Sequence, residues 1–423
     1  MLEITQIREN REAIIERLKV RNMDATEQLN RIFELDAQWR AEKQALEAVS
    51  AEQNKVSKSI GQLFKEGKQE EAQAAKAKGT ELKEQEKSIV DGVNKLADEI
   101  QQLLYEIPNI PHPSVPAGNT DEDNEVVFES GEIPTVGDNW KPHWDLAKEF
   151  DLIDFELGVK VTGAGFPFYK GKGARLQRAL INFFLDEARD AGYKEIIPPF
   201  VVNEASGYGT GQLPDKEGQM YHVTSEDLYL IPTAEVPLTN IFRDEMLKEE
   251  DLPVCLTGYT PCFRREAGSY GKDVRGLNRL HQFDKVEIVR VEHPAQSYAV
   301  LDQMVVYVQG LLTKLELPFR TLRLCGGDLG FTSALTFDLE VYSAAQDKWL
   351  EVSSISNFET YQANRLKLRF KDANKKKQLA HTMNGSALAL PRILAALLEN
   401  NQDGNGINIP EVLVPYTGFN RID

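Results

Sequence analysis

The sequence predicts an α+β protein in which a long antiparallel helical hairpin precedes a domain built on an antiparallel sheet with flanking helices. Two observations support this prediction. Residues 25–107 contain no proline and are rich in Glu, Gln, Lys and Ala, a composition that favours helices. Further along, short β-branched and aromatic runs alternate with helical stretches but seldom form regular strand–helix–strand units, which favours an antiparallel sheet over a doubly wound parallel one.

Apolar residues in the first stretch recur in steps of three and four, the spacing of a coiled-coil seam. The two seams are Leu35, Trp39, Leu46, Val49, Val56, Ile60 and Leu63, then Leu82, Ile89, Val93, Leu96, Ile100, Leu103 and Ile107. Breaks at residues 65–68 and 78–79 let the chain reverse between them. A first helix of about 40 residues would be roughly 60 Å long, so we expect a projecting arm. Seams alone would favour a dimerisation or spacer device, and only the domain that follows the arm can outweigh that preference.

A proline-rich and acidic linker ends the helical stretch. Four prolines lie between residues 108 and 116, and residues 121–125 are mostly acidic. We therefore expect an N-terminal domain at residues 1–110 and a second domain at residues 111–423. The expected strands include residues 195–197, 228–231, 285–289 and 336–341, and the expected helices residues 174–191 and 295–315.

Composition excludes several classes of protein. No apolar run reaches the roughly 18 residues that cross a bilayer, and the N-terminus lacks the features of a signal peptide, so we expect a cytoplasmic protein without a membrane partner. Three cysteines and six histidines without ligand spacing predict neither a zinc site nor a disulfide framework. The net charge of −17 argues against a nucleic-acid partner, but Lys and Arg recur along the N-terminal third, and their distribution matters more than the sum.

The strongest chemical signal is an ordered set of arginines, a glutamate and an aromatic residue. Arg264 and Glu266 come first, Arg279 and Phe283 follow, and Arg392 lies in a late run of small residues that we predict to be helical, with a possible bend before it. Arginine side chains stay charged and bind phosphate oxygens in pairs, so this set suits a polyphosphate.

The first two parts of this set are predicted to meet in space. If residues 263–266 and 280–289 form neighbouring antiparallel strands, their arginines and Glu266 converge on one nucleotide. The glycine-rich loop of residues 268–276 between them is then predicted to be a lid. No Ser-His-Asp or Cys-His arrangement points to a covalent enzyme intermediate.

The chain resembles the seryl-tRNA synthetase family of class II aminoacyl-tRNA synthetases, in both the arm and the body. The segments that carry the resemblance are residues 208–214, 233–235, 261–269, 279–287, 351–354, 381–386 and 410–416. The resemblance implies a class II catalytic domain, with motif 1 at about residues 174–199, motif 2 at about 260–289 and motif 3 at about 384–396.

The resemblance also implies the reaction and its nucleotide site. L-Serine and ATP would give seryl-adenylate and pyrophosphate, and the seryl group would then move to the 3′ end of tRNA(Ser). Arg264 would hold the α-phosphate and the serine carboxylate, and Glu266 would face the adenine amino group. Phe283 would stack on one face of the adenine and Arg392 on the other, and Arg392 would also reach the γ-phosphate, assisted by Arg279. The full expected ATP site is Arg264, Arg265, Glu266, Arg279, Phe283, Glu351, Val352, Ser353, Ser354 and Arg392, with Glu351 and Ser354 as Mg²⁺ ligands.

A serine pocket is implied in the same way, at Thr233, Ala234, Glu235, Arg264, Glu287, Asn384 and Ser386. A site that pairs the serine hydroxyl leaves buried polar groups unsatisfied when alanine binds, and a close wall excludes threonine. The resemblance further implies a homodimer formed through motif 1. It also implies an arm that reads the long variable arm of tRNA bound to the other subunit, and recognition of tRNA(Sec).

Two alternatives remain open. A relative that loads an amino acid onto a carrier protein would share the body but lack the long arm. A non-enzymatic RNA-binding or regulatory paralogue would have lost some of Arg264, Glu266, Glu287, Glu351 and Arg392, and all five are present.

Overall fold

The computed structural model describes residues 1–137, 139–266 and 275–423. The chain divides into two compact units, one made of residues 2–19 and 23–108 and the other of Met1, residues 20–22 and residues 109–423.

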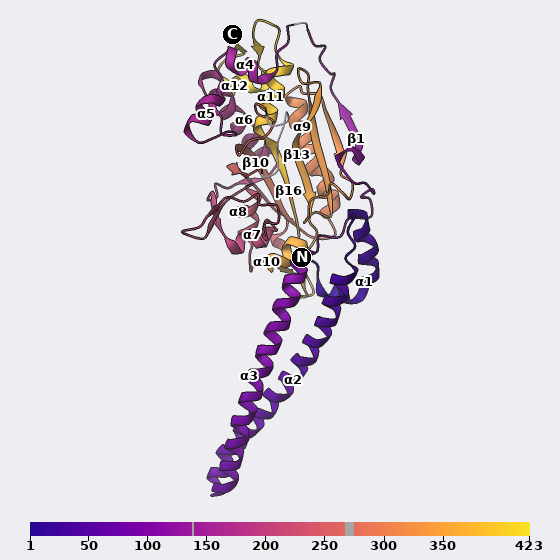
Figure 1. The fold of residues 1–423 in the computed structure, drawn as a ribbon, viewed down its shortest axis with the longest axis vertical. Coiled ribbons are helices and arrows are strands. Elements are labelled where there is room, and N and C mark those ends of the chain that lie inside the picture. The colour runs from indigo at the N-terminus through magenta and orange to yellow at the C-terminus, as the bar shows by residue number, and fades with distance from the viewer. Residues whose placement is uncertain (138, 267–274) are drawn as a thin grey trace. The chain divides into compact units, whose positions relative to one another are not determined.

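The first unit is helical, with α1 at Ile4–Leu18, α2 at Thr26–Lys65 and α3 at Gln69–Glu106. Helices α2 and α3 run side by side and form the predicted antiparallel hairpin (Figure 1). Side chains pair along its length: Arg31 Nη2 lies 2.6 Å from Glu99 Oε1, and Ser50 Oγ donates to Glu86 Oε1 at 2.7 Å. Within the described residues, no helix is both long and apolar enough to span a membrane.

One predicted feature of the hairpin is wrong. The chain reverses only at residues 66–68, and the expected break at residues 78–79 lies inside α3. A Cβ on Gly79 would lie 3.7 Å from Val56 Cγ1, so Gly79 faces α2. A single glycine within a helix costs about 1 kcal/mol relative to alanine, and packing along the seam outweighs this cost at Gly79.

The second unit is built on an eight-stranded sheet with strand order β1-β11-β12-β13-β16-β10-β9-β4. Every neighbouring pair is antiparallel except β4 with β9, which confirms the predicted antiparallel sheet. The strands are β1 Glu125–Ser130, β4 Lys194–Glu195, β9 Val254–Phe263, β10 Gln282–Glu292, β11 Phe319–Arg323, β12 Leu335–Ser343, β13 Lys348–Asn357 and β16 His381–Ala389.

Three helices pack against this sheet and bury one apolar core: α6 at Gly171–Asp190, α9 at Ser297–Lys314 and α11 at Leu390–Asn400 (Figure 1). Val286 and Ile288 of β10 belong to that core. Since side chains alternate along a strand, Phe283, Lys285 and Glu287 face the other side of the sheet.

Shorter elements complete the second unit. The helices are α4 His143–Glu149, α5 Phe155–Val161, α7 Glu204–Thr210, α8 Glu235–Asn240, α10 Tyr361–Leu366 and α12 Val414–Thr417. The strands are β2 Ile153–Asp154, β3 Phe168–Tyr169, β5 Val201–Asn203, β6 His222–Val223, β7 Leu228–Leu230, β8 Met246–Lys248, β14 Arg369–Lys371, β15 Lys377–Leu379, β17 Ile407–Asn408 and β18 Arg421–Ile422.

The late small-residue run differs from the prediction. Gly385 to Ala389 form the end of strand β16, and α11 begins only at Leu390. Pro391 lies in the first turn of α11, where no intrahelical bond needs its missing N–H group. Pro391 therefore starts the helix instead of bending it, and Arg392 projects from the first turn.

Candidate active site

Strands β9 and β10 bring the motif 2 residues together. Phe263 pairs with Gln282, and Arg264 N donates to His281 O at 2.9 Å just beyond that pair. The Arg264 guanidinium lies 5.2 Å from the ring centroid of Phe283. The predicted antiparallel neighbours are thus present. The predicted lid falls mostly on residues 267–274, which lie outside the described residues.

An ion pair lies just beyond the ends of these strands. Arg279 Nε lies 3.3 Å from Glu266 Oε2, so these two predicted nucleotide-binding residues meet across the loop. Glu266 has a φ of 49°, a left-handed conformation that is uncommon for residues other than glycine. Its side chain is mostly buried, which limits the directions in which the carboxylate can point.

His281 supports the turn after β9. Its Nδ1 lies 3.0 Å from Tyr221 Oη and 3.1 Å from Arg264 O, and its ring stacks on Phe166 with centroids 5.5 Å apart. Its backbone N donates to Gly165 O at 2.9 Å. Residue 165 has to be glycine, because its φ is +82° and a Cβ there would lie 2.4 Å from the His281 ring.

The predicted serine-pocket residues gather on one face of β10 and β16. Glu287 pairs with Ser386 in the ladder between these strands. Thr233 Oγ1 donates to Glu287 Oε2 at 3.0 Å. The Asn384 amide Nδ2 donates to Glu287 Oε1 and to Glu235 Oε2, each at 3.0 Å. Thr233, Glu235, Glu287 and Asn384 are thus joined in one polar cluster, and Ser386 lies beside Glu287; all but Asn384 are buried.

Two buried carboxylates in this cluster share one amide donor. Burial, together with repulsion from Glu287, raises the pKa of Glu235 to about 7, although Gln362, Lys285 and Arg264 act in the opposite direction. Lys285 Nζ lies 2.5 Å from Glu287 Oε2 and offsets part of the charge. Two carboxylates face one lysine here, so the site can accept one further positive charge, such as an ammonium group.

Sequence reasoning missed two members of this pocket. Gln362 on α10 donates to Glu235 Oε1 at 2.6 Å and accepts from Thr382 Oγ1 at 2.8 Å. Lys285 is almost completely buried against Glu287. Lys285 lies two residues before Glu287, so strand alternation placed it on the same face and could have identified it. Gln362 carries no comparable signal, because only the tertiary fold brings α10 to the sheet.

A third group of oxygen atoms lies on β12 and β13. Asp338 pairs with Ser354, and Glu340 pairs with Glu351, with a register shift between the two pairs. Burial raises the pKa of Asp338 well above its usual range, and repulsion from Glu351 adds to the effect. Asp338 Oδ1 is buried without a hydrogen-bond partner among the described residues. Carboxylate and hydroxyl oxygens of this kind suit a hard divalent cation.

Val352 and Ser353, which lie between Glu351 and Ser354, are buried. Val352 belongs to the apolar core, and Ser353 Oγ donates to Ser386 O at 2.6 Å. Their side chains therefore stabilise the sheet, and a contact with a nucleotide would have to come from their backbone. Arg265 is exposed, and its backbone N donates to Gln219 O at 2.9 Å.

Arg392 connects α11 to two other parts of the site. Its Nε donates to Asn278 O at 2.9 Å, and its Nη1 donates to Glu351 O at 2.7 Å. The same Nη1 lies 3.6 Å from Glu351 Oε2. Arg392 is thus held between Asn278 of motif 2 and the expected metal-site residue Glu351.

The antiparallel sheet, the arginines at its strand ends and the arginine on the late helix define a class II aminoacyl-tRNA synthetase. Residues 221–401 match the family model of the tRNA synthetase class II core domain (G, H, P, S and T), and residues 1–111 match that of the seryl-tRNA synthetase N-terminal domain. The chain is 50% identical to a serine–tRNA ligase from Salinibacter ruber, over 100% of this chain and 99% of that one. It is 45% identical to one from Chlorobaculum parvum, over the full length of both chains. The chain belongs to the seryl-tRNA synthetase family.

Solved structures agree with this assignment. A seryl-tRNA synthetase from Pyrococcus horikoshii, complexed with ATP, superposes with a TM-score of 0.92 at 35% identity, covering 100% of this chain and 99% of that one. A cytoplasmic serine-tRNA ligase from Naegleria fowleri, in complex with AMP, gives a TM-score of 0.87 at 29% identity, covering 100% and 99%. A prolyl-tRNA synthetase from Giardia lamblia shares the fold alone, with a TM-score of 0.57 at 17% identity over 64% of this chain and 54% of that one.

Proposed function

We propose that the protein activates L-serine with ATP and transfers the seryl group to the 3′ end of tRNA(Ser). The observation that carries this proposal is the buried pair Glu235 and Glu287, bridged by Asn384, within the electrostatic reach of Arg264. The carboxylates suit the ammonium of an amino acid, and the arginine suits its carboxylate and a phosphate. The site could therefore hold the ammonium and the carboxylate of one amino acid at the same time.

In the first step, the serine carboxylate attacks the α-phosphorus of ATP and pyrophosphate leaves. We assign Arg264 to the carboxylate and α-phosphate, Phe283 and Glu266 to the adenine, and Arg279 and Arg392 to the outer phosphates. Catalysis then comes from orientation and from the fixed positive charges that face the developing negative charge. The ATP in the Pyrococcus horikoshii complex supports a nucleotide site in this fold.

We propose that Mg²⁺ binds with the nucleotide at Glu351 and Ser354. The unpartnered, buried Oδ1 of Asp338 on the neighbouring strand supports this site, because a nearby cation would stabilise its charged form. Bound there, Mg²⁺ would neutralise charge on the phosphates.

We assign the choice of serine to Thr233, Glu235, Glu287, Asn384 and Ser386, and include the buried backbone of Ala234 beside them. Each side chain has a polar atom that can pair the ammonium or hydroxyl of serine. Alanine has the same ammonium but would leave the groups that pair the hydroxyl unsatisfied, which costs about 1–3 kcal/mol for each buried group.

In the second step, the terminal hydroxyl of the tRNA attacks the adenylate carbonyl and AMP leaves. We assign tRNA(Ser) to the helical hairpin, whose family match supports this partner, and extend the proposal to tRNA(Sec) and to a homodimer that pairs through motif 1. We place the reaction in the cytoplasm, where charged tRNA is used. A carrier-protein acceptor is the second candidate, and the presence of the hairpin weighs against it.

Substitution of Arg264 by alanine tests the activation step. We expect serine-dependent exchange of pyrophosphate into ATP to fall at least about 1,000-fold, the scale of losing a fixed charge at the transition state. Arg264→Lys should recover part of the activity because it keeps the charge without the planar fork.

The matched control is Arg421→Ala, which removes another paired arginine, held by Asp403 at 2.6 Å and not part of the site. Exchange in the control should stay near that of the unaltered protein. Near-normal exchange in Arg264→Ala would contradict the role given to Arg264.

A further inference from the structure

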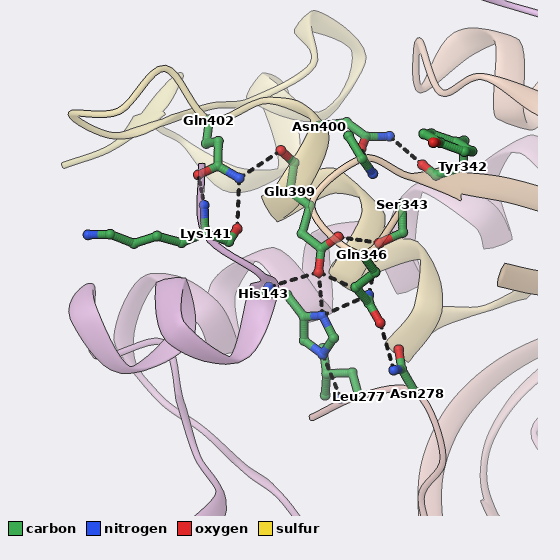
Figure 2. A network of polar contacts seen from close by, with 11 residues as sticks. Lys141, His143, Leu277, Asn278, Tyr342, Ser343, Gln346, Glu399, Asn400 and Gln402 are labelled. Atoms are coloured by element: carbon green, nitrogen blue, oxygen red, sulfur yellow. Dashed lines mark hydrogen bonds and ion pairs between the residues drawn. The ribbon is translucent and has the colours of Figure 1, made fainter. Parts of the chain in front are cut away.

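A buried polar network joins α4, α11 and the end of β12 to Leu277 and Asn278, which precede β10 within motif 2 (Figure 2). The carboxylate of Glu399 on α11 is completely buried, as is the ring of His143 on α4. Glu399 Oε1 accepts from His143 N at 2.8 Å, His143 Nδ1 at 2.7 Å and Gln346 Nε2 at 3.0 Å, and its Oε2 accepts from Ser343 Oγ. Four protein donors thus replace the water that a carboxylate would otherwise hold.

The hydrogen bonds of His143 determine its tautomer. Leu277 N, a backbone donor, contacts His143 Nε2 at 2.8 Å, so Nε2 has to be the acceptor. The proton therefore lies on Nδ1 and is donated to Glu399 Oε1. Glu399 orients the ring, and the ring then holds the backbone of Leu277.

Two further contacts attach the same segment. Asn278 Nδ2 donates to Gln346 Oε1 at 2.8 Å, which gives the network a second branch (Figure 2). The Arg275 guanidinium lies 4.5 Å from the ring centroid of Trp144 on α4. Gly276 packs so closely that a Cβ there would lie 2.2 Å from His143 Nε2.

The attached segment positions two arginines of the proposed ATP site. Asn278 O accepts from Arg392 Nε at 2.9 Å, and the next residue, Arg279, lies 3.3 Å from Glu266. A shift of the backbone at Leu277 and Asn278 would therefore displace both guanidinium groups. Glu399 lies on the same helix as Arg392. Helix α11 therefore supplies both Arg392 and the carboxylate that, through His143, fixes the segment to which Arg392 is bonded.

We propose that the His143–Glu399 pair, with Gln346, positions Arg279 and Arg392 for ATP by fixing the backbone at Leu277 and Asn278. This inference rests on the proposed function of the same site. His143 lies behind the segment and contacts the arginines only through it, so it is a positioning residue. Its loss should weaken ATP binding more than serine binding, because the network holds Leu277 and Asn278, whereas the serine-pocket side chains are held by hydrogen bonds to one another.

Two substitutions of His143 separate its two hydrogen bonds. In His143→Asn, the amide nitrogen replaces Nδ1 and still reaches Glu399, but no acceptor remains for Leu277. In His143→Gln, the longer side chain can place its amide oxygen near Nε2 and accept from Leu277. We expect the KM for ATP in pyrophosphate exchange to rise about tenfold in His143→Asn and by less than about threefold in His143→Gln, with the KM for serine nearly constant in both.

Gln346→Ala and Gln402→Ala complete the series. Gln346→Ala removes the side-chain anchor of Asn278 at a half-buried position and should raise the KM for ATP several-fold. The control, Gln402→Ala, removes a comparable anchor of Lys141: Gln402 accepts from Lys141 N and donates to Lys141 O, each at 2.8 Å, and it reaches the backbone O of Glu399 but not its carboxylate or the Leu277 and Asn278 segment. It should lower the melting temperature without changing the KM for ATP.

The Kd for ATP, measured by calorimetry on each variant without serine, provides a readout that is independent of the reaction. Equal Kd values for ATP in the unaltered protein, His143→Asn and Gln346→Ala would overturn the inference, as would a parallel rise in the KM for serine. Absence of serine-dependent exchange in the unaltered protein would instead contradict the proposed function, while the Kd values would still test the positioning role.

Discussion

Glu235 is the residue whose charge state most directly connects the structure to function. Burial and the neighbouring Glu287 hold its pKa at about 7 instead of the usual 4.5. Because the pKa is raised on folding, ionisation of Glu235 destabilises the ligand-free protein progressively between about pH 4.5 and pH 7, and the loss levels off above pH 7. A bound ammonium would favour the ionised form and recover this free energy.

The affinity for serine should therefore increase with pH. Only ionised Glu235 pairs with the serine ammonium, so we expect the Kd for serine to fall about tenfold between pH 6 and pH 8, as for a single group with a pKa near 7. Calorimetric titration with serine measures this directly. Glu235→Gln serves as the control, since it should bind weakly without the pH step. A Kd for serine that is constant from pH 6 to pH 8 in the unaltered protein would rule out Glu235 as the group that pairs the ammonium.

At the scale of single residues, the sequence predicts the motif residues but not the residues that hydrogen-bond to them. Thr233, Glu287, Asn384 and Ser386 were expected to share a pocket, and the structure brings them together. Gln362 was not expected. Its role depends on where α10 meets the sheet, a long-range contact that leaves no local pattern in the sequence.

At the scale of elements, a β-bulge in β13 places Glu351 and Ser354, the two residues of the expected metal site, on the same face of the strand. Glu351 and Ser354 are three residues apart, so a regular strand would point them to opposite faces. The register shift between their pairs with Glu340 and Asp338 inserts one extra residue in β13. Glu340 and Asp338 are two residues apart and share a face, so Glu351 and Ser354 share it too. Local sequence patterns do not reveal such a bulge.

The helical hairpin is the element that should separate activation from transfer to tRNA. Ser50 Oγ and Glu86 Oε1 lie 2.7 Å apart on α2 and α3, so a short Gly-Ser turn can join these positions and remove residues 51–85. The removed part carries several lysines, including Lys55, Lys58, Lys65 and Lys68. Loss of phosphate contacts should reduce serylation of tRNA at least about 100-fold and leave pyrophosphate exchange unchanged.

A shorter truncation provides the matched control. Val56 and Gly79 face each other, so joining them removes residues 57–78 and retains more of the hairpin. This variant should lose less serylation than the longer truncation. Unchanged serylation in both variants would favour an acceptor that does not use the hairpin.

At the scale of the whole molecule, exposed apolar residues lie at the end of the predicted motif 1 and just beyond it. Ile197, beyond the edge strand β4, has 82% of its surface exposed, and Phe200 and Val201 close to it are also exposed. A large apolar side chain so exposed is expected at an interface between subunits. These exposed residues therefore suit the homodimer interface proposed above.

A charge at this position should separate the subunits. We expect Ile197→Asp to sediment with half the mass of the unaltered protein, because burying an unpaired carboxylate in an interface costs several kcal/mol. Val306→Asp on α9 is the control, since Val306 is 64% exposed and lies outside motif 1. Equal masses for Ile197→Asp and the unaltered dimer, or a monomeric unaltered protein, would contradict this assignment.

The sequence by itself determined the class of fold, the helical hairpin and the family. These properties follow from helix propensity, apolar periodicity and an ordered set of motif residues, all of which are local patterns. The tertiary structure decided that Gly385 to Ala389 form a strand, that α3 continues through Gly79, and that a bulge aligns Glu351 with Ser354. It also joined His143 and Glu399 behind Arg279 and Arg392. Each of these depends on packing or pairing between distant segments, whose free energy outweighs local preference and is not encoded at any single position.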